Sequence, residues 1–287
     1  MLHPNEVRVA KRKDELAIKT FLSEKPLIHR HLDWRHPLDW ISTNQLLLSI
    51  NQMGKIEGFF CCSQEIANIF WIRIFACKQK NHLFSLWNDF FNFYNSIPDK
   101  SGRKKILSLA YHPWMVNLLE LEGWKMIDNI VQFELVNKTL NEMQSPQSNS
   151  YIRKMVKGDL TEAYQIDSER FDQTWQQTFN TFLLSYTQAN YATVFVIDGR
   201  LVGFQLSTIE GQRAHLARIA VDKDYSGQGI GTALINDLIQ YCQDRNIKKI
   251  SVNTQETNSH SISLYRKTGF QKIVGSFPIY LLAETNI

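Results

Sequence analysis

Three short segments in the first half of the chain have counterparts in the second half, in the same order and about 145 residues further on. The pairs are 55–59 with 200–204, 87–90 with 235–238, and 118–124 with 264–270. The full length of 287 residues is enough for two domains of ordinary size. Because a repeat at one nearly constant separation indicates a duplicated folding unit, we predict two similar domains, at 1–138 and 151–287, joined by a polar linker at 139–150.

The apolar pattern of the second half predicts which elements each domain contains. Four aromatic residues recur at helical spacing near its start: Phe171, Trp175, Phe179 and Phe182. Three strand-like runs follow at 191–198, 201–210 and 214–221, with turns short enough for an antiparallel meander. A helix, a strand, a second helix closed by Gly269 and a final hairpin complete the pattern. The expected fold class is α+β, of the α/β sandwich type, with a mixed, mostly antiparallel sheet flanked by helices in each domain.

The segment YSGQGIGT, residues 225–232, places three glycines between a predicted strand and a predicted helix. Glycines let backbone N–H groups approach a ligand, and the first turn of a helix favours negative charge, so the segment predicts a pyrophosphate site. The dinucleotide pattern GxGxxG fails, because Thr232 or Leu234 stands where the last glycine should be. The Walker A pattern fails as well, because no lysine follows the glycines. A tight turn without any ligand is the structural alternative.

The composition excludes several classes of protein. Hydrophobic residues make up 44% of the chain, and no apolar stretch approaches the roughly 20 residues of a membrane span. A net charge of +4 suits an anionic small ligand better than a nucleic acid. The first residues lack the apolar core of a signal peptide, and four cysteines without paired spacing resemble reduced thiols. We expect a cytoplasmic protein with no nucleic-acid partner, no membrane partner and no metal.

A group of histidines in the first half could suggest a metal site, but it lacks any ligand spacing typical of one. The group consists of His29, His31, Asp33 and His36. The sequence therefore predicts a solvated turn at this place.

Two motifs in the second half resemble those of one known family. The run Ser226-Gly227-Gln228-Gly229-Ile230-Gly231 resembles the acetyl-CoA signature of the GNAT superfamily of N-acetyltransferases, Gln/Arg-x-x-Gly-x-Gly/Ala, which opens the helix after the fourth strand. Ser226 departs from that signature, since it replaces an arginine or glutamine. The segment from Asn253 to Phe270 is similar to the family's Asn...Leu-Tyr...Gly-Phe segment. The resemblance covers the chain from about residue 151 to its end.

This resemblance implies transfer of an acetyl group from acetyl-CoA, the co-substrate, to a primary amine by direct attack in a ternary complex. Main-chain groups of Ile219, Ala220 and Val221 would pair with the pantetheine as a further strand does. Asn258 would reach the pantetheine or the backbone beside it. The pyrophosphate would be held by the loop residues Ser226, Gly227, Gln228, Gly229, Ile230, Gly231 and Thr232.

Two residues are candidates for proton transfer. Tyr265 matches the family's general acid, which protonates the leaving thiolate, although an aromatic ring that only packs the helix is the alternative. His215 stands where the histone-acetylating branch of the superfamily carries its general-base glutamate, and an imidazole titrates in the useful range. A strand histidine that only hydrogen-bonds a neighbour is the alternative for this position.

The acceptor is less constrained than the chemistry. In the family, acceptor contacts come from the first two helices and the last hairpin, which here contain Phe171, Trp175 and the segment 277–280. The fourth strand and the segment NTQETN are similar to the branch that acetylates protein N-termini, including those of ribosomal proteins. We expect a protein N-terminus or a small-molecule amine as acceptor, and a monomer or a homodimer. A non-catalytic acyl-CoA-binding sensor, or partner-recognition module, is the alternative function.

The first half lacks the features that carry this chemistry in the second half. No glycine occurs between Gly58 and Gly102, and the loop that corresponds to 225–232 is shorter. Leu119 stands at the position of Tyr265. We predict a degenerate, non-catalytic copy that packs against the other domain or shapes its acceptor cleft.

Overall fold

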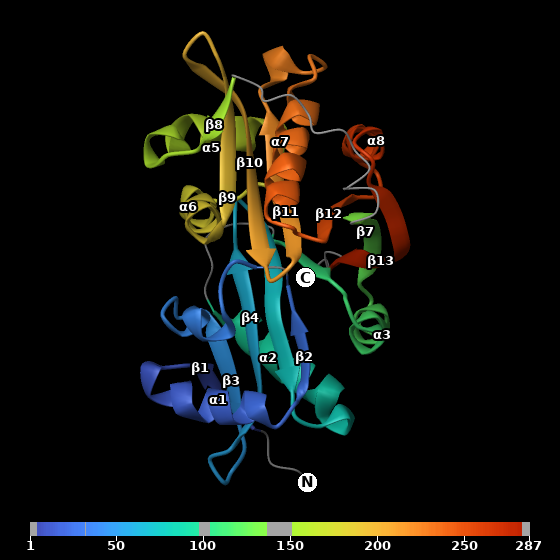
Figure 1. The fold of residues 1–287 in the computed structure, drawn as a ribbon. Helices are drawn as coiled ribbons and strands as arrows, with labels where there is room; N and C mark the ends of the chain where they lie inside the picture. Colours follow the sequence, from blue (N-terminus) through green and yellow to red (C-terminus); the bar gives the residue numbers. More distant parts are fainter. Residues whose placement is uncertain (1–4, 32, 98–103, 137–150, 283–287) are drawn as a thin grey trace. The chain divides into compact units, whose positions relative to one another are not determined.

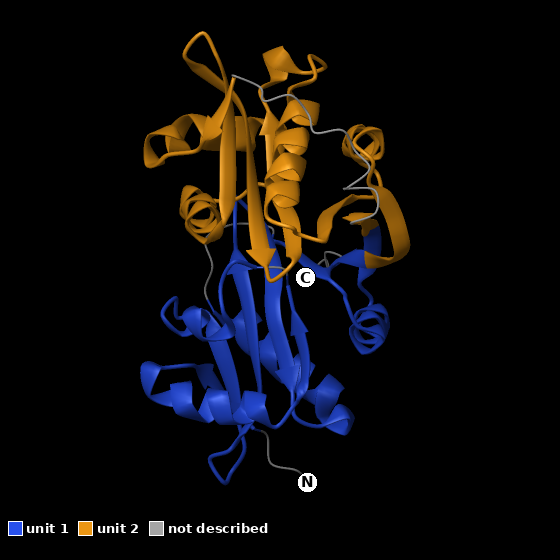
Figure 2. Cartoon of the chain, in the orientation of Figure 1, with its two compact units in different colours: residues 1–127, 278–287 blue, residues 128–277 orange. Residues whose placement is uncertain are grey.

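The structure is a computed structural model, shown in Figure 1, and the described residues are 5–31, 33–97, 104–136 and 151–282. The chain forms two compact units, which Figure 2 distinguishes by colour. Unit 1 consists of residues 1–127 with 278–287, and unit 2 consists of residues 128–277. The predicted linker at 139–150 lies outside the described residues. The bounds of the units differ from the predicted division of the chain because the last strand of each half pairs with strands of the other half.

Unit 1 contains a mixed sheet with helices packed on it. Its elements are β1 (Glu6–Val9), α1 (Glu15–Ser23), β2 (Leu27–Arg30), β3 (Leu46–Ile50), β4 (Ile56–Gln64), β5 (Ile69–Cys77), α2 (Leu83–Ser96), β6 (Lys105–Leu109) and α3 (Pro113–Leu121). Strands β1, β3, β4 and β5 pair in an antiparallel order, and β6 pairs with β5 in parallel.

Unit 2 repeats this arrangement. Its elements are β7 (Lys125–Val136), β8 (Ile152–Lys154), α5 (Leu160–Arg170), α6 (Phe179–Gln188), β9 (Tyr191–Ile197), β10 (Arg200–Glu210), β11 (Arg213–Val221), α7 (Ile230–Asp244), β12 (Lys249–Gln255), α8 (Ser259–Lys267) and β13 (Gln271–Leu281). From α5 to α8 its helices and strands follow the predicted order, although the strand β8, which the sequence did not predict, precedes α5. Strands β8 to β11 form an antiparallel meander, and β12 pairs with β11 in parallel. Both units therefore have the mixed, mostly antiparallel sheet that the sequence predicts.

Two details of the second half differ from the prediction. Phe171 and Trp175 do not continue a helix, because they lie in the connection between α5 and α6. That connection is held by side-chain hydrogen bonds and an ion pair, which outweigh the helical spacing of its aromatic residues. The expected terminal hairpin is a single strand, β13, that continues through Pro278.

A matching ion pair supports the duplication at the level of atoms. In unit 1, Arg8 makes two hydrogen bonds to Asp14, of 2.7 and 2.8 Å, and Asp14 also accepts one from a backbone N–H. In unit 2, Arg153 and Asp159 repeat these contacts at the same two distances and with the same backbone hydrogen bond. Each pair fixes the turn that connects the first strand of a unit to its first helix.

The last strand of each half pairs in the unit formed mainly by the other half. β7 follows α3 in the sequence, but it pairs antiparallel with β12 of unit 2, from Val136↔Lys249 to Ile130↔Gln255. β13 follows α8, but its end pairs with β6 of unit 1 through Ile279↔Leu109. Unit 2 is therefore completed by residues 128–136, which precede the predicted linker.

Unit 1 has one strand that unit 2 does not repeat in the described residues. β2 pairs antiparallel with the end of β5, from Leu27↔Cys77 to Arg30↔Ile74. The prediction of a solvated turn is wrong here, because His29 lies in β2 and is fully buried. The polar sequence of this stretch hides a strand that is buried through its pairing with β5.

The sheet of unit 2 has an apolar layer on each face. On one face, α7 and α8 pack on β11, β12 and β7 around Leu216, Val252 and Phe133. On the other face, α5 and α6 pack on β9, β10 and the end of β11 around Phe204 and Ala220. The candidate site lies where β11 passes between these two layers.

Candidate active site

The two central strands of unit 2 pair for only part of their length. β11 and β12 pair from Arg213↔Lys249 to Leu216↔Val252, although β11 continues to Val221 and β12 to Gln255. In the described part of unit 2, no further pairing joins these two strands. The later part of β11 therefore presents backbone groups on the side that faces away from β10.

A β-bulge marks the point where the two strands separate. Leu206 of β10 pairs with Arg218 and Ser207 pairs with Leu216, so that Ala217 has no residue opposite it. Leu216 packs under α7, whereas Arg218 forms an ion pair with α5. Because the bulge absorbs one residue, His215 and Arg218 both face α5 instead of pointing to opposite sides of the sheet.

The predicted acetyl-CoA residues lie along this opening. Ile219, Ala220 and Val221 form the end of β11, where they pair with β10 on one side only. Ser226 to Gly229 follow after a short turn and are exposed. The strand end and the glycine loop are thus separated only by the short turn at Lys223–Tyr225.

The glycine loop opens α7 in a conformation that favours glycine. Gly227 and Gly229 have φ angles of +80° and +83°, and a Cβ atom at either position would meet no atom within 4 Å. Gly229 caps α7 without any side-chain hydrogen bond, which leaves the first backbone N–H groups available to an anion. Glycine is needed here for its backbone angle, since there is room for a larger side chain.

Helix α8 is held beside this loop. A Cβ atom at Gly231 in the first turn of α7 would lie 3.1 Å from the side chain of Leu264 and 3.8 Å from that of Val221. Asn258 caps α8, because its side chain accepts a hydrogen bond of 3.1 Å from the Ser261 N–H. The side-chain oxygen of Asn258 is thus used within the protein, and its amide nitrogen lies 3.4 Å from Gln255 Oε1.

Tyr265 lies on α8 with only 4% of its surface exposed. Its ring packs between Phe133 and Phe270, at centroid distances of 5.9 and 6.1 Å. Burial raises the pKa of its hydroxyl to about 12, against the opposing effect of a hydrogen bond with Ser261. The phenol is therefore protonated at neutral pH and can act as a proton donor.

His215 lies on β11 just before the bulge and is hydrogen-bonded to the neighbouring strand. Its Nδ1 is 3.0 Å from the hydroxyl oxygen of Ser251. That hydroxyl donates a hydrogen bond of 3.3 Å to the carbonyl oxygen of Ala214. If Ser251 donates to Ala214, then Nδ1–H donates to Ser251 and Nε2 keeps its lone pair. Burial lowers the pKa of His215 below its usual value of 6.5, so the neutral imidazole predominates at neutral pH.

The sequence did not single out Asn253, which is the first residue of β12 beyond its pairing with β11. Its Oδ1 atom is buried and makes no hydrogen bond within the described structure. An unsatisfied buried carbonyl oxygen is costly unless a ligand or water supplies a donor. Asn253 opens the motif segment 253–270, but only the end of the strand pairing brings it to the candidate site.

Strand β7 adds polar side chains to the same region. Gln132 lies directly opposite Asn253, and Glu134 lies directly opposite Ser251. Val131, Phe133 and Leu135 point into the layer under α7, so these two polar residues share the other face of the sheet with His215. Glu134 forms an ion pair of 2.5 Å with Lys249.

The corresponding region of unit 1 is closed. The end of β5 from Ile74 to Cys77 pairs with β2 on the side that β11 leaves open in unit 2. Residues 78–82 connect β5 to α2 without a glycine. Leu119, at the position of Tyr265, is fully buried in the apolar core.

The separated strands, the open glycine loop at a helix start and the buried phenol together suit an acyltransferase site. The comparison with protein families agrees, because residues 160–270 match the model described as Acetyltransferase (GNAT) family. Over residues 160–270 the second half of this chain is similar to the GNAT family, and the protein is an acyltransferase of the N-acetyltransferase class.

The relatives with similar sequences each match less than half of the chain. An Escherichia coli K12 protein, the ribosomal protein bS18 alanine N-acetyltransferase, is 28% identical over 114 residues, which are 40% of this chain and 76% of the relative. A Bacillus subtilis protein with the same name, assigned provisionally, is 27% identical over 127 residues, which are 44% of this chain and 83% of the relative.

A solved structure matches both halves of the chain in fold. It is a tandem GNAT protein from the clavulanic acid biosynthesis pathway, with a TM-score of 0.69 and 13% identity, and the match covers 96% of this chain and 98% of that protein. The duplication predicted from the repeat is therefore confirmed as a tandem fold. At this identity the match concerns the fold alone.

The described residues fit acetyl-CoA, which this family uses. The exposed N–H groups at the start of α7 suit the pyrophosphate. The open side of β11 suits an extended chain with amide groups, and the buried Oδ1 of Asn253 lacks a donor. Within the described residues, no cluster of three or more metal-ligating side chains occurs, and no helix is long and apolar enough to cross a membrane.

Proposed function

We propose that the chain transfers an acetyl group from acetyl-CoA to a primary amine at one active site, located in unit 2. The observation that carries this proposal is the separation of β11 from β12 beyond Leu216↔Val252, next to the glycine loop. When bound there, acetyl-CoA supplies an activated acetyl group as a thioester. Ile219 to Val221 would hold its pantetheine, and the residues from Ser226 to Thr232 would hold its pyrophosphate.

In the proposed mechanism, His215 accepts a proton from the attacking amine. The lowered pKa keeps its imidazole neutral near pH 7, and the hydrogen bond to Ser251 supports the tautomer with a free Nε2. Nitrogen forms a bond to the acetyl carbon while the carbon–sulfur bond breaks. Tyr265 donates its proton to the departing sulfur, which its raised pKa permits because the phenol is fully protonated beforehand.

We propose a protein N-terminus as the acceptor, with an N-terminal alanine as the first candidate. Two relatives of this chain are named for acetylation of an alanine of ribosomal protein bS18. The face that carries His215 also carries Gln132, Glu134 and Asn253, which offer hydrogen-bond acceptors to an amine and to a peptide backbone.

Unit 1 is proposed to be a non-catalytic copy. Its strand end is paired with β2, and Leu119 offers no proton. The first half of the chain still supplies a structural part, because its strand β7 completes the sheet of unit 2.

A turnover assay tests the proposed function directly. The full chain would be incubated with acetyl-CoA and a peptide that begins with alanine, and thiol release and the mass of the peptide would be measured. An increase of one acetyl group on the N-terminus supports the proposal. Binding of acetyl-CoA without turnover of peptides or of small amines would favour the acyl-CoA-binding module instead.

A further inference from the structure

Arg218 occupies a position that the proposed chemistry does not yet explain. It follows the bulged Ala217 and directly precedes Ile219, the first of the proposed pantetheine residues. Its guanidinium forms a bidentate ion pair with Asp167 of α5, through Nη2 to Oδ2 at 2.7 Å and through Nε to Oδ1. Asp167 is fully buried, and only 9% of the Arg218 side chain is exposed.

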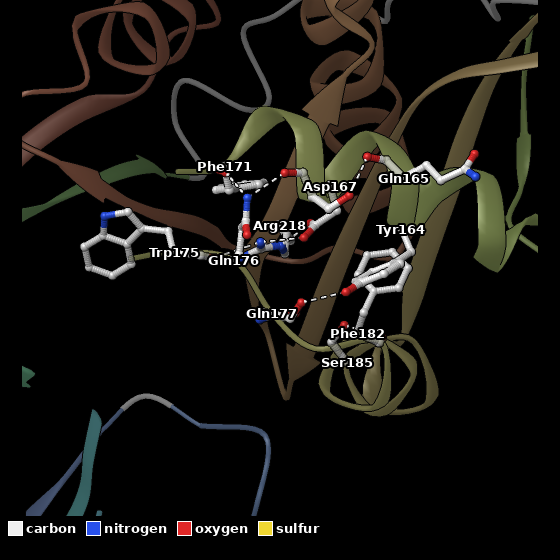
Figure 3. A network of polar contacts seen from close by, with 11 residues as sticks. Tyr164, Gln165, Asp167, Phe171, Trp175, Gln176, Gln177, Phe182, Ser185 and Arg218 are labelled. Carbon is white, nitrogen blue, oxygen red and sulfur yellow. Dashed lines mark hydrogen bonds and ion pairs between the residues drawn. The ribbon is translucent and has the colours of Figure 1, made fainter. Parts of the chain in front are cut away.

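The same guanidinium also holds the connection between α5 and α6. Its Nη2 donates a hydrogen bond of 3.0 Å to the carbonyl oxygen of Trp175, and it stacks on Phe171 at 3.7 Å from the ring centroid. Figure 3 shows these contacts converging on Arg218, with the indole of Trp175 directed away from it. Arg218 therefore fixes the backbone at residue 175.

Other contacts complete the anchoring of this connection. Gln176 donates hydrogen bonds of 2.7 and 2.9 Å to the carbonyl oxygens of Ser168 and Phe171. Tyr164 donates one of 3.2 Å to the carbonyl oxygen of Gln177. The segment 171–177 belongs to no helix or strand, and besides local hydrogen bonds to Asp167 and Asp172 it is held by these side-chain contacts and by Arg218.

The bulge determines what this anchored segment can act on. Because Ala217 is bulged, Arg218 and His215 face the same side of the sheet, at the point where β11 leaves β12. A segment attached to Arg218 therefore lies on the side from which an amine must approach His215. The charge of Arg218 is already balanced by Asp167, which argues against a direct role in binding an anion.

We infer that Arg218 is a positioning residue for the acceptor, which ties the segment 171–177 to β11 beside the general base. This inference rests on the proposed function. Loss of the Arg218 contacts should affect the two substrates differently. It displaces the segment 171–177, whereas the open side of β11 and the glycine loop keep their contacts. Arg218 thus sets the affinity for the amine and not the affinity for acetyl-CoA.

Initial rates with acetyl-CoA and the alanine peptide, together with calorimetry of acetyl-CoA, test this inference. Arg218→Lys keeps the charge but loses the planar fork that reaches both Asp167 and Trp175. We expect the KM for the peptide to rise by about tenfold or more, while the dissociation constant of acetyl-CoA stays within about twofold. A double variant with Asp167→Asn and Arg218→Gln removes both charges of the pair, so that no unpaired charge stays buried. It should also raise the KM for the peptide without changing the affinity for acetyl-CoA.

Unit 2 offers a matched control in the bidentate pair of Arg153 and Asp159. Arg153→Lys should leave the KM for the peptide unchanged. An unchanged KM in the Arg218 variants would overturn the inference, as would an equal loss of acetyl-CoA affinity or the same KM change in the control.

Hydrogen exchange decides the matter even if the alanine peptide is not the acceptor. The amides of residues 172–177 should exchange at least about tenfold faster in Arg218→Lys than in the wild type or in Arg153→Lys, while α7 keeps its protection. Unchanged exchange in this segment would refute the inference. Failure of the wild type to bind acetyl-CoA would refute the proposed function, and that result is visible separately in the calorimetry.

Discussion

Arg30 of β2 pairs with Ile74 of β5, where the paired end of β5 begins. This end of β5 corresponds to the end of β11 that is open in unit 2. The same stretch of sheet is thus closed by the chain itself in one unit and open in the other. A strand already paired on both sides has no backbone groups left for an extended ligand. This difference between the copies leads to the first prediction.

We predict one acetyl-CoA site per chain, located in unit 2. Calorimetry of the full chain should give a stoichiometry of one. Ser226→Glu should weaken binding by about threefold to tenfold, because it places a carboxylate at the exposed loop that would hold the pyrophosphate. Lys80→Glu is the control, since Lys80 is exposed in the corresponding connection of unit 1 and its replacement should change nothing. Two equal sites would contradict the assignment.

Gly229→Ala should weaken acetyl-CoA binding by about tenfold or more. An alanine at a φ of +83° costs roughly 1–2 kcal/mol, and relief of that strain would move the N–H groups at the start of α7. Titration calorimetry measures the affinity, and thermal unfolding measures the strain. Gly199→Ala provides a matched control at a φ of +79° in the turn between β9 and β10. It should lower stability by a similar amount without weakening binding, and equal losses of affinity in both variants would remove the loop from the site.

The pH profile should identify His215 as the general base. Burial lowers its pKa, so kcat/KM should fall as the pH drops below about 6.5 and the imidazole becomes protonated. His215→Gln should reduce kcat by about 100-fold and should abolish this acidic limb, while acetyl-CoA binding persists. His260→Gln, which removes an exposed imidazole from α8, should leave the profile as it is. An acidic limb that survives in His215→Gln would assign it to another group.

Tyr265→Phe should lower kcat by about 100-fold, with little change in acetyl-CoA affinity. The ring and its packing on Phe133 and Phe270 remain, and only the proton donor is lost. Because the pKa of Tyr265 is raised to about 12, the wild type should show no decline from this group below pH 10. Tyr241→Phe in α7, part of the same apolar layer, is the control. Equal turnover by Tyr265→Phe and the wild type at every pH would give Tyr265 a packing role only.

Much of the candidate site could be predicted from local sequence. The glycine loop, the strand before it and the tyrosine of α8 are close in sequence, and glycine at a positive φ leaves a visible signature. The repeat also predicted the duplication, since the corresponding segments occupy β4 and β10, α2 and α7, and α3 and α8. These features depend on residues within one or two elements, where spacing and propensity decide the structure.

Other parts of the site depend on pairing between distant segments. Asn253 is conspicuous only because β12 leaves β11 at that residue, and Gln132 lies opposite it only because β7 pairs in unit 2. The aromatic spacing of Phe171 and Trp175 predicted a helix, but both residues lie in an irregular connection. The ion pair of Arg218 with Asp167 lies beside this connection. No local pattern records which distant residue will balance a charge or complete a sheet.

The sequence by itself determined the repeated α+β fold, the glycine loop at Gly227 and Gly229 that is the candidate anion site, and the candidate proton donor, because each depends on short-range spacing and backbone preference. Tertiary structure alone decided that β7 and β13 complete the opposite units, that β2 closes the first copy, and that the bulge at Ala217 turns Arg218 to the side of His215. The physical reason is that strand pairing and buried charge are satisfied by residues far apart in the chain, and only the folded backbone brings those residues together.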